Sequence, residues 1–332
     1  MVGKVPATFV ASLALATLAT GASGQTTLRA SHQWPGGQGD VRDEMVQIIA
    51  EEVAKAGVDL EIQIYPGASL HDPYEQWGAL VSGQLDLSAF PLDYASGREP
   101  AFSATLMPGL VRNHERARRL NDSPFMADIK AIIEEAGVMV IADAWLAGGF
   151  ASTQECITSP ETMQGQATRA AGPMFEQMLA GAGASIASMP SSEIYTGMQT
   201  GVLDAANTSS GSFVSYRLYE QVDCLTAPGE NALWFMYEPI LMSKQSFEEL
   251  TPEQQDAILA AGQKSEEFFA AEAEKLDQEM IDVFKEAGVE VVEMSPEDYD
   301  AWLAIAKETS YATFAEEVEG GQALIDKALA VE

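Results

Sequence analysis

The feature that most limits the fold is an alternation of strand-like and helix-like segments near the start of the chain. Segments 27–31, 60–65 and 85–90 have strand patterns, and helical stretches that begin near Asp40 and Tyr74 separate them. Strand, helix, strand, helix, strand is the order of a parallel α/β layer. This part of the chain therefore predicts an α/β unit.

A second cycle follows. Val138–Trp145 predicts one buried strand, and Gly148-Gly149 then interrupts the apolar run. Helices are predicted from Pro173 and from Ser192, each followed by a short strand. We expect two α/β units with the crossover near Gly149.

The last third predicts one long helix. Thr251-Pro-Glu-Gln254 has a capping threonine, proline at the first helical position and glutamine three residues after the cap. Helical residues continue almost to Gly288, and Gly262 is a candidate bend. About 36 residues make a rod of roughly 54 Å, which exceeds one domain and predicts a helix that connects two.

The N-terminus predicts export. Lys4 precedes a short apolar run, Val5–Leu18, and small residues end at Gly24. This is the order of a secretory signal peptide, residues 1–24, with cleavage after about Gly24. The run is too short to span a bilayer, so we expect a soluble periplasmic protein.

The net charge of −32 argues against nucleic acid as a partner, because an acidic surface repels phosphates. Any site for an organic anion then needs its own local cation. Cys156 and Cys224 leave two alternatives open: one disulfide in an oxidising compartment, or two small buried thiols.

Motifs of catalysis and metal binding are missing. His32, His71 and His114 are far apart, and the sequence has no Gly-x-Ser-x-Gly elbow, phosphate loop or Cys-x-x-Cys. We expect no metal, no cofactor and no enzymatic activity.

Three motifs lie between residues 158 and 208. They are Ser159-Pro-Glu-Thr-Met-Gln-Gly-Gln-Ala-Thr-Arg169, Gly183-Ala-Ser-Ile-Ala-Ser-Met-Pro-Ser-Ser-Glu-Ile-Tyr195 and Met198-Gln-Thr-Gly-Val-Leu-Asp204. In this order and spacing they resemble the substrate-binding subunits of TRAP transporters, the DctP-like family. The resemblance implies a two-domain periplasmic binding protein that closes like a clam shell. Domain I is expected at 26–148 plus about 233–275, and domain II at 149–232 plus about 276–332.

The resemblance places the ligand-gripping arginine of the family at Arg169. The residues agree, because a guanidinium offers a carboxylate two charge-assisted hydrogen bonds. No other Lys or Arg lies between Lys130 and Arg217. The alternative is an ordinary surface salt bridge.

One departure concerns the ligand. Many members carry a second arginine where this chain has Ala151, and the sialic-acid type has an aromatic residue at Ser191. Their replacement favours a monocarboxylate with an uncharged body, aromatic or apolar. Other expected contacts are Asn207 and Thr208, which could instead serve a turn, and the aromatic residues Trp34, Phe90, Trp145 and Phe150, which could instead pack in the core.

The resemblance implies delivery of a small organic acid to a small and a large TRAP membrane subunit. Separately, we expect the protein to be a monomer. Two other functions are alternatives. One is a ligand sensor that feeds a receptor kinase, and the other is a secreted hydrolase, for which the sequence shows no nucleophile, metal site or acid pair.

Overall fold

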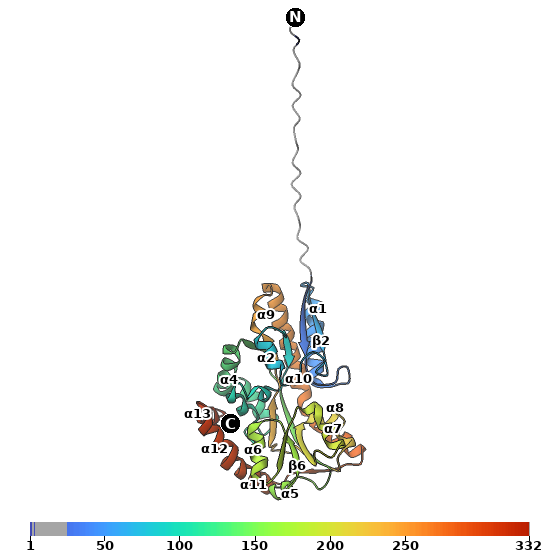
Figure 1. Ribbon diagram of the computed structural model, residues 1–332, viewed down its shortest axis with the longest axis vertical. Coiled ribbons are helices and arrows are strands. Elements are labelled where there is room, and N and C mark those ends of the chain that lie inside the picture. The colour runs from blue at the N-terminus through green and yellow to red at the C-terminus, as the bar shows by residue number, and fades with distance from the viewer. Residues whose placement is uncertain (2, 4–24, 332) are drawn as a thin grey trace.

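Residues 1, 3 and 25–331 are described by the structure, a computed structural model (Figure 1). The predicted cleavage site after Gly24 lies outside these residues. Two β-sheets with helices packed around them form the frame, which confirms the α/β class.

The first sheet has the strand order β2-β1-β3-β11-β4. Its first three strands are parallel, and β11 runs antiparallel to β3 and β4. The strand bounds are β1 (Thr26–Ser31), β2 (Leu60–Tyr65), β3 (Leu87–Ala89), β4 (Val138–Ala142) and β11 (Ile240–Ser243). In β2 the apolar residues Leu60 and Ile62 are buried between exposed polar ones, as the alternating pattern predicts.

The second sheet has the order β12-β9-β5-β8-β6-β7, and β10 pairs with β5. Its central strand β5 runs antiparallel to β8, β9 and β10, whereas β6 lies parallel to both β7 and β8. The bounds are β5 (Trp145–Ser152), β6 (Ala167–Ala170), β7 (Ser185–Ser188), β8 (Ala205–Ser209), β9 (Cys224–Ala227), β10 (Trp234–Tyr237) and β12 (Glu290–Glu293).

Helices surround both sheets. They are α1 (Val41–Ala56), α2 (Gln76–Val81), α3 (His114–Asn121), α4 (Pro124–Glu135), α5 (Pro160–Met163), α6 (Pro173–Gly181), α7 (Ile194–Gln199), α8 (Ser210–Ser215), α9 (Lys244–Glu248), α10 (Pro252–Glu286), α11 (Pro296–Ala306), α12 (Ala312–Glu317) and α13 (Gly321–Leu329). Short 3-10 turns are η1 (Leu92–Ala95), η2 (Pro100–Leu106), η3 (Ser191–Glu193) and η4 (Leu218–Glu220), and a π-helical turn is η5 (Lys307–Tyr311).

The predicted long helix is confirmed as α10, which has 35 residues. Thr251 caps it, and the side chain of Gln254 bonds back to the Thr251 backbone. The helix packs on α1 and β4 of the first unit and on α8 and β12 of the second (Figure 1). Gly262 allows close packing, because a methyl group there would lie 2.4 Å from the Ile141 carbonyl oxygen.

The predicted strand Val138–Trp145 is wrong as a single element. The chain leaves the first sheet after Ala142 and enters the second at Trp145. Gly148 and Gly149 lie inside β5, where added methyl groups would meet the carbonyl oxygens of neighbouring strands at 1.9 and 2.1 Å. An apolar run of this kind carries no periodicity that marks where one sheet ends and the next begins.

The apolar core lies in three clusters. One packs α1 and α10 on the first sheet, one packs α7, α8 and the end of α10 on the second, and the largest joins the two units. The domain limits stay a prediction. No helix that the structure describes is both long and apolar enough to cross a membrane.

Candidate ligand-binding site

Arg169 lies near the carboxyl end of β6, between β7 and β8, and only 1% of its surface is exposed. Its Nε donates to the carbonyl of Met189 at 2.9 Å, and its Nη1 donates to the carbonyl of Asn207 at 2.8 Å. Its Nη2 donates to the hydroxyl of Tyr94 at 2.8 Å. All three acceptors are neutral, and no carboxylate oxygen of the described residues lies within 4.0 Å of the guanidinium.

Tyr94 belongs to the turn η1 after β3, so its bond to Arg169 joins the two units. The same hydroxyl oxygen accepts the backbone N–H of Ser191 at 2.9 Å. The Tyr94 ring contacts Tyr74, with centroids 4.7 Å apart, and meets Phe90 edge-on at 6.3 Å. Sequence reasoning missed Tyr94 and Tyr74. Tyr94 comes just after the predicted strand that ends at Phe90. Because α/β folds bind ligands at the carboxyl ends of strands, this position could have identified Tyr94.

Asn207 and Thr208 lie within β8, one strand away from Arg169, and not in a turn. Both are buried. The side-chain Oδ1 and Nδ2 atoms of Asn207 have no hydrogen-bond partner among the described residues. A buried amide without a partner is costly, so these atoms are available to a polar group that enters the site.

Trp34 is held at the junction of the units by Arg42. The Arg42 guanidinium lies 4.0 Å above the indole ring, and the indole Nε1 donates to Ser212 at 3.2 Å. Arg42 is fully buried, and its charge is met by Asp40 at 2.6 Å and Glu238 at 2.8 Å. The guanidinium beside it holds the pKa of Asp40 below its usual value despite burial, whereas burial raises the pKa of Glu238.

The structure places Trp145 and Phe150 among other protein groups. The Trp145 ring packs on Tyr237 and donates to Asn121 at 2.8 Å. The Phe150 ring stacks on Trp302 with centroids 5.7 Å apart. Each of these two rings has a packing partner within the protein, and its role as a ligand contact stays a prediction.

Asp93 adds a neutral acid beside Arg169. Burial, together with the nearby charge of Glu176, raises the pKa of Asp93 to about 8, although Ser103 and Arg169 act to lower it. Its Oδ2 has no partner in the part of the chain that the structure describes. The carboxyl faces Gly172 at the start of α6, where an added methyl group would lie 1.3 Å from Oδ2.

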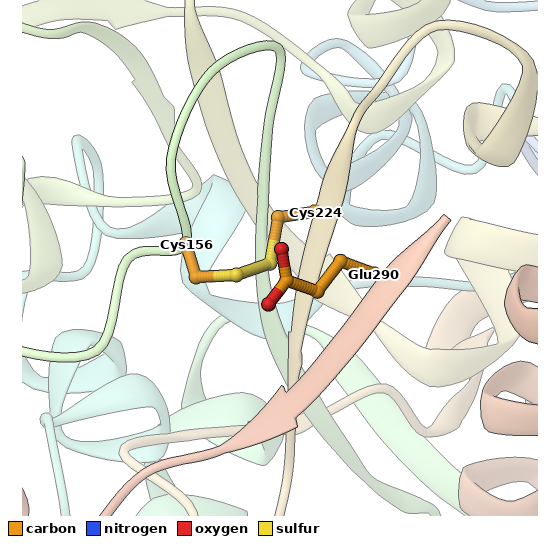
Figure 2. A group of neighbouring side chains, drawn as sticks. All are labelled: Cys156, Cys224 and Glu290. Carbon is orange, nitrogen blue, oxygen red and sulfur yellow. A yellow bond between two sulfur atoms is a disulfide. The ribbon is translucent and has the colours of Figure 1, made fainter. Parts of the chain in front are cut away.

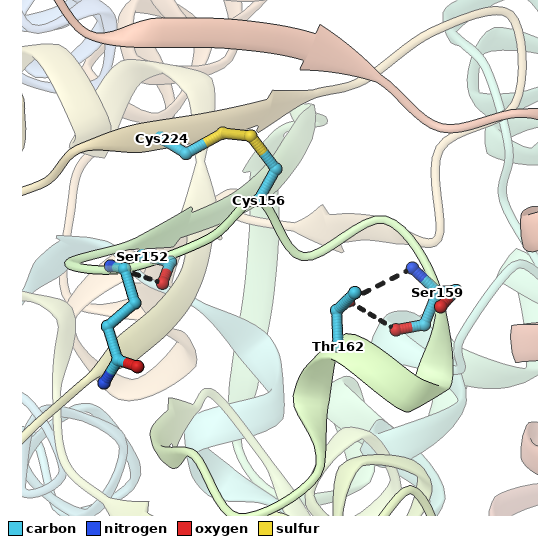
Figure 3. The surroundings of a disulfide bond; sticks show 6 residues. Ser152, Cys156, Ser159, Thr162 and Cys224 are labelled. Atoms are coloured by element: carbon cyan, nitrogen blue, oxygen red, sulfur yellow. Dashed lines mark hydrogen bonds between the residues drawn. A yellow bond between two sulfur atoms is a disulfide. The ribbon is translucent and has the colours of Figure 1, made fainter.

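Cys156 and Cys224 form a disulfide, with Cα atoms 5.2 Å apart (Figure 2). The bond ties the loop between Ser152 and Ser159 to the start of β9 (Figure 3). Glu290 of β12 lies beside Cys224 in register, and its carboxylate is close to both sulfurs. Sulfurs in a disulfide are not thiolates, so this group does not offer a metal two soft ligands.

Comparison with known proteins agrees with this geometry. The model of the family described as bacterial extracellular solute-binding protein, family 7 (DctP) matches residues 32–317. A solute-binding protein of Albidiferax ferrireducens is 38% identical over 299 residues, covering 89% of this chain and 88% of that protein.

Solved structures show the same fold. A TRAP periplasmic solute-binding protein from Rhodoferax ferrireducens with bound malonate has a TM-score of 0.87 at 38% identity, covering 91% of this chain and 96% of that one. DctP7 of Bordetella pertussis, which binds pyroglutamic acid, has a TM-score of 0.82 at 20% identity, covering 91% and 99%. The predicted resemblance and the two-domain binding-protein fold are confirmed. The chain belongs to the bacterial extracellular solute-binding proteins of family 7, the DctP family.

Proposed function

We propose that this protein captures a small organic acid as a monocarboxylate on Arg169 and delivers it to the small and large membrane subunits of a TRAP transporter. The observation that carries the proposal is the buried Arg169 guanidinium with neutral acceptors only. Burial of a charge without a counter-charge is unfavourable, and an entering carboxylate removes that cost. Two parallel N–H groups of the guanidinium can then hold the two carboxylate oxygens.

The number of uncompensated cations supports a single carboxylate. Among the described residues the buried arginines and lysines are Arg42, Arg116 and Arg169. Arg42 already faces two acids, and Arg116 of α3 donates to the carbonyls of Leu110, Ala328 and Val331. Ala151 stands where the family resemblance implies a second arginine in many members. A second carboxylate would therefore enter without a cation of its own.

The groups around Arg169 suit an uncharged ligand body with at least one polar atom. Tyr74, Phe90 and Tyr94 provide ring surfaces, and the free Asn207 amide provides a donor and an acceptor. We assign the further contacts of the ligand to Trp34, Ser191 and Thr208. Because the Rhodoferax ferrireducens protein holds malonate, short dicarboxylates belong in any test of this specificity.

Export to the periplasm is part of the proposal. The signal-like residues 1–24 and the Cys156–Cys224 disulfide both favour an oxidising compartment. A mature protein that begins at Gln25 when expressed with its leader supports this point. Retention of residues 1–24 in the exported protein contradicts it.

The test is a thermal-shift screen against monocarboxylates, dicarboxylates and uronates. A ligand that binds the folded state raises the melting temperature by mass action. We expect monocarboxylates to raise it for the wild type and for Arg217→Ala, an exposed arginine paired with Glu220. Arg169→Ala should lose the shift, and Arg169→Lys should keep only part of it, because lysine lacks the planar fork.

Two outcomes overturn parts of the proposal. A shift that survives in Arg169→Ala moves the carboxylate site elsewhere. A larger shift with malonate or a uronate than with any monocarboxylate overturns the specificity but leaves Arg169 in place. The bound compound should be recovered intact by mass spectrometry, since turnover would indicate a hydrolase.

A further inference from the structure

In a chain with 50 acidic and 18 basic residues, carboxylates are in excess over the bases that they can pair with. Most of the bases that the structure describes have a carboxylate oxygen within 4.0 Å. Those without such a partner in the described residues are Arg98, Arg112, Arg116, Arg169, Lys244, Lys285 and Lys307. Arg169 belongs to the site above. Three of the others, Arg112, Arg116 and Lys307, line one cavity.

This cavity has a volume of about 620 Å³ and lies between the segment 109–116 and the C-terminal helices α11 and α13. Its size is that of a site for a small organic ligand, which is roughly 300–1,000 Å³. Besides the three bases, its walls are mainly apolar or aromatic, with Tyr299, Tyr311, Leu303 and Ile325 among them. Asp300 is the acid among the lining residues, so the bases outnumber the acid.

The walls of the cavity are held in place by specific bonds. Arg116 is only 7% exposed, and its guanidinium donates to the carbonyls of Leu110, Ala328 and Val331. Burial and the neighbouring Arg112 charge lower the pKa of Arg116, as expected for two bases with no acid between them. Tyr311 donates to the carbonyl of Pro108 at 3.0 Å.

The helical turn that carries Lys307 and Tyr311 is a π-helix. This form is rare, and single π-helical turns occur frequently at functional sites. Here it places one cation and one aromatic ring on the wall of the same cavity.

We propose that this cavity is a second anion site, separate from Arg169, that binds a small carboxylate with an apolar body. The exposed Arg112 and Lys307 hold the carboxylate, and Tyr299, Tyr311 and the aliphatic residues cover the body. Arg116, fixed by three carbonyls, adds a permanent positive charge behind them. This second site is independent of the identity of the ligand at Arg169.

Calorimetric titration of the purified protein with octanoate tests the proposal. We expect octanoate to bind in the Arg169→Ala background, and the double variant Arg112→Ala/Lys307→Ala to weaken that binding about tenfold or more. The matched control is Arg118→Ala/Lys275→Ala, which removes two exposed bases that are paired with Glu274 and Glu272. It changes the net charge equally and should leave the affinity within about twofold.

Octan-1-ol has a similar alkyl chain but no charge, so it tests whether the carboxylate of octanoate contributes to binding. We expect octan-1-ol to bind much more weakly than octanoate. The proposal is overturned if Arg169→Ala abolishes octanoate binding, if the protein binds no octanoate, or if the two double variants bind it equally. Equal binding of octanol and octanoate also overturns it, because the bases would then contribute nothing.

Discussion

The hydroxyl of Tyr94 accepts a hydrogen bond from Nη2 of Arg169 at 2.8 Å, across the boundary between the two sheets. The arginine proposed to grip the ligand therefore also holds the two units together. Closure and ligand binding share one group, so a change at either end of this bond should affect both.

Tyr94→Phe should weaken ligand binding about tenfold, because it removes the acceptor of Arg169 and of the Ser191 N–H while it keeps the ring. The ligand-free variant should also have a larger radius of gyration by small-angle X-ray scattering. Tyr195→Phe, which removes an exposed hydroxyl bonded to Glu220, is the control. An unchanged affinity for Tyr94→Phe would mean that the Tyr94 hydroxyl does not contribute to ligand binding.

Gly172→Ala should keep the fold but hinder closure. Its methyl group would collide with Asp93, which belongs to the other unit, and this contact is relieved when the units separate. We expect an affinity lower by about tenfold or more, with little loss of thermal stability. The control is Gly97→Ala, where the added methyl meets nothing within 4 Å. Equal affinities for the two variants would contradict the prediction.

The Asp93 carboxyl should make stability fall as pH rises. Its pKa is about 8 in the folded protein, against 3.8 ordinarily, so the folded state holds a proton that the unfolded state releases. The stabilisation of the folded state by the protonated Asp93 carboxyl is therefore complete below about pH 4 and is lost progressively as the pH rises towards 8. Urea unfolding measures the free energy of unfolding of both proteins at pH 5 and pH 9. Between these two pH values the wild type should lose on the order of a few kcal/mol more of this free energy than Asp93→Asn. A parallel pH dependence of both proteins would refute this.

Arg42→Met should destabilise the protein by about 3–5 kcal/mol, because Asp40 and Glu238 would stay buried without their counter-charge. Arg217→Met removes an exposed arginine and should cost about 0–1 kcal/mol. Chemical denaturation measures both. Adding Asp40→Asn and Glu238→Gln to Arg42→Met should restore part of the loss. No restoration would mean that the Arg42 side chain acts through packing alone.

Loss of the disulfide should reduce stability but not binding. Cys156→Ser/Cys224→Ser removes a link across 68 residues, with an expected loss of about 2–5 kcal/mol. Ser152, the register partner of Cys224, lies opposite Ala205 at the start of β8, whereas Asn207 lies further along the same strand. Affinity should therefore stay within about twofold. A large loss of affinity in the folded variant would place the disulfide in the binding mechanism.

Local features of the chain were predictable from the sequence. The Thr251 capping box and the helical run behind it predicted α10, and the alternation of Leu60–Tyr65 predicted β2. The three motifs predicted the family and placed Arg169 in a strand. Each of these depends on residues within one or two turns of each other, or on a pattern shared with relatives.

The sequence by itself determined two α/β units, one long helix and one arginine, Arg169, with no other Lys or Arg close to it along the chain. Only the tertiary structure decided that Tyr94, 75 residues earlier, meets that arginine, and that Glu238, 196 residues later, neutralises Arg42. It also decided that Val138–Trp145 divides between two sheets and that the cysteines pair. The reason is physical: capping and periodicity act through hydrogen bonds a few residues apart, whereas burial and charge pairing depend on segments that only folding brings together.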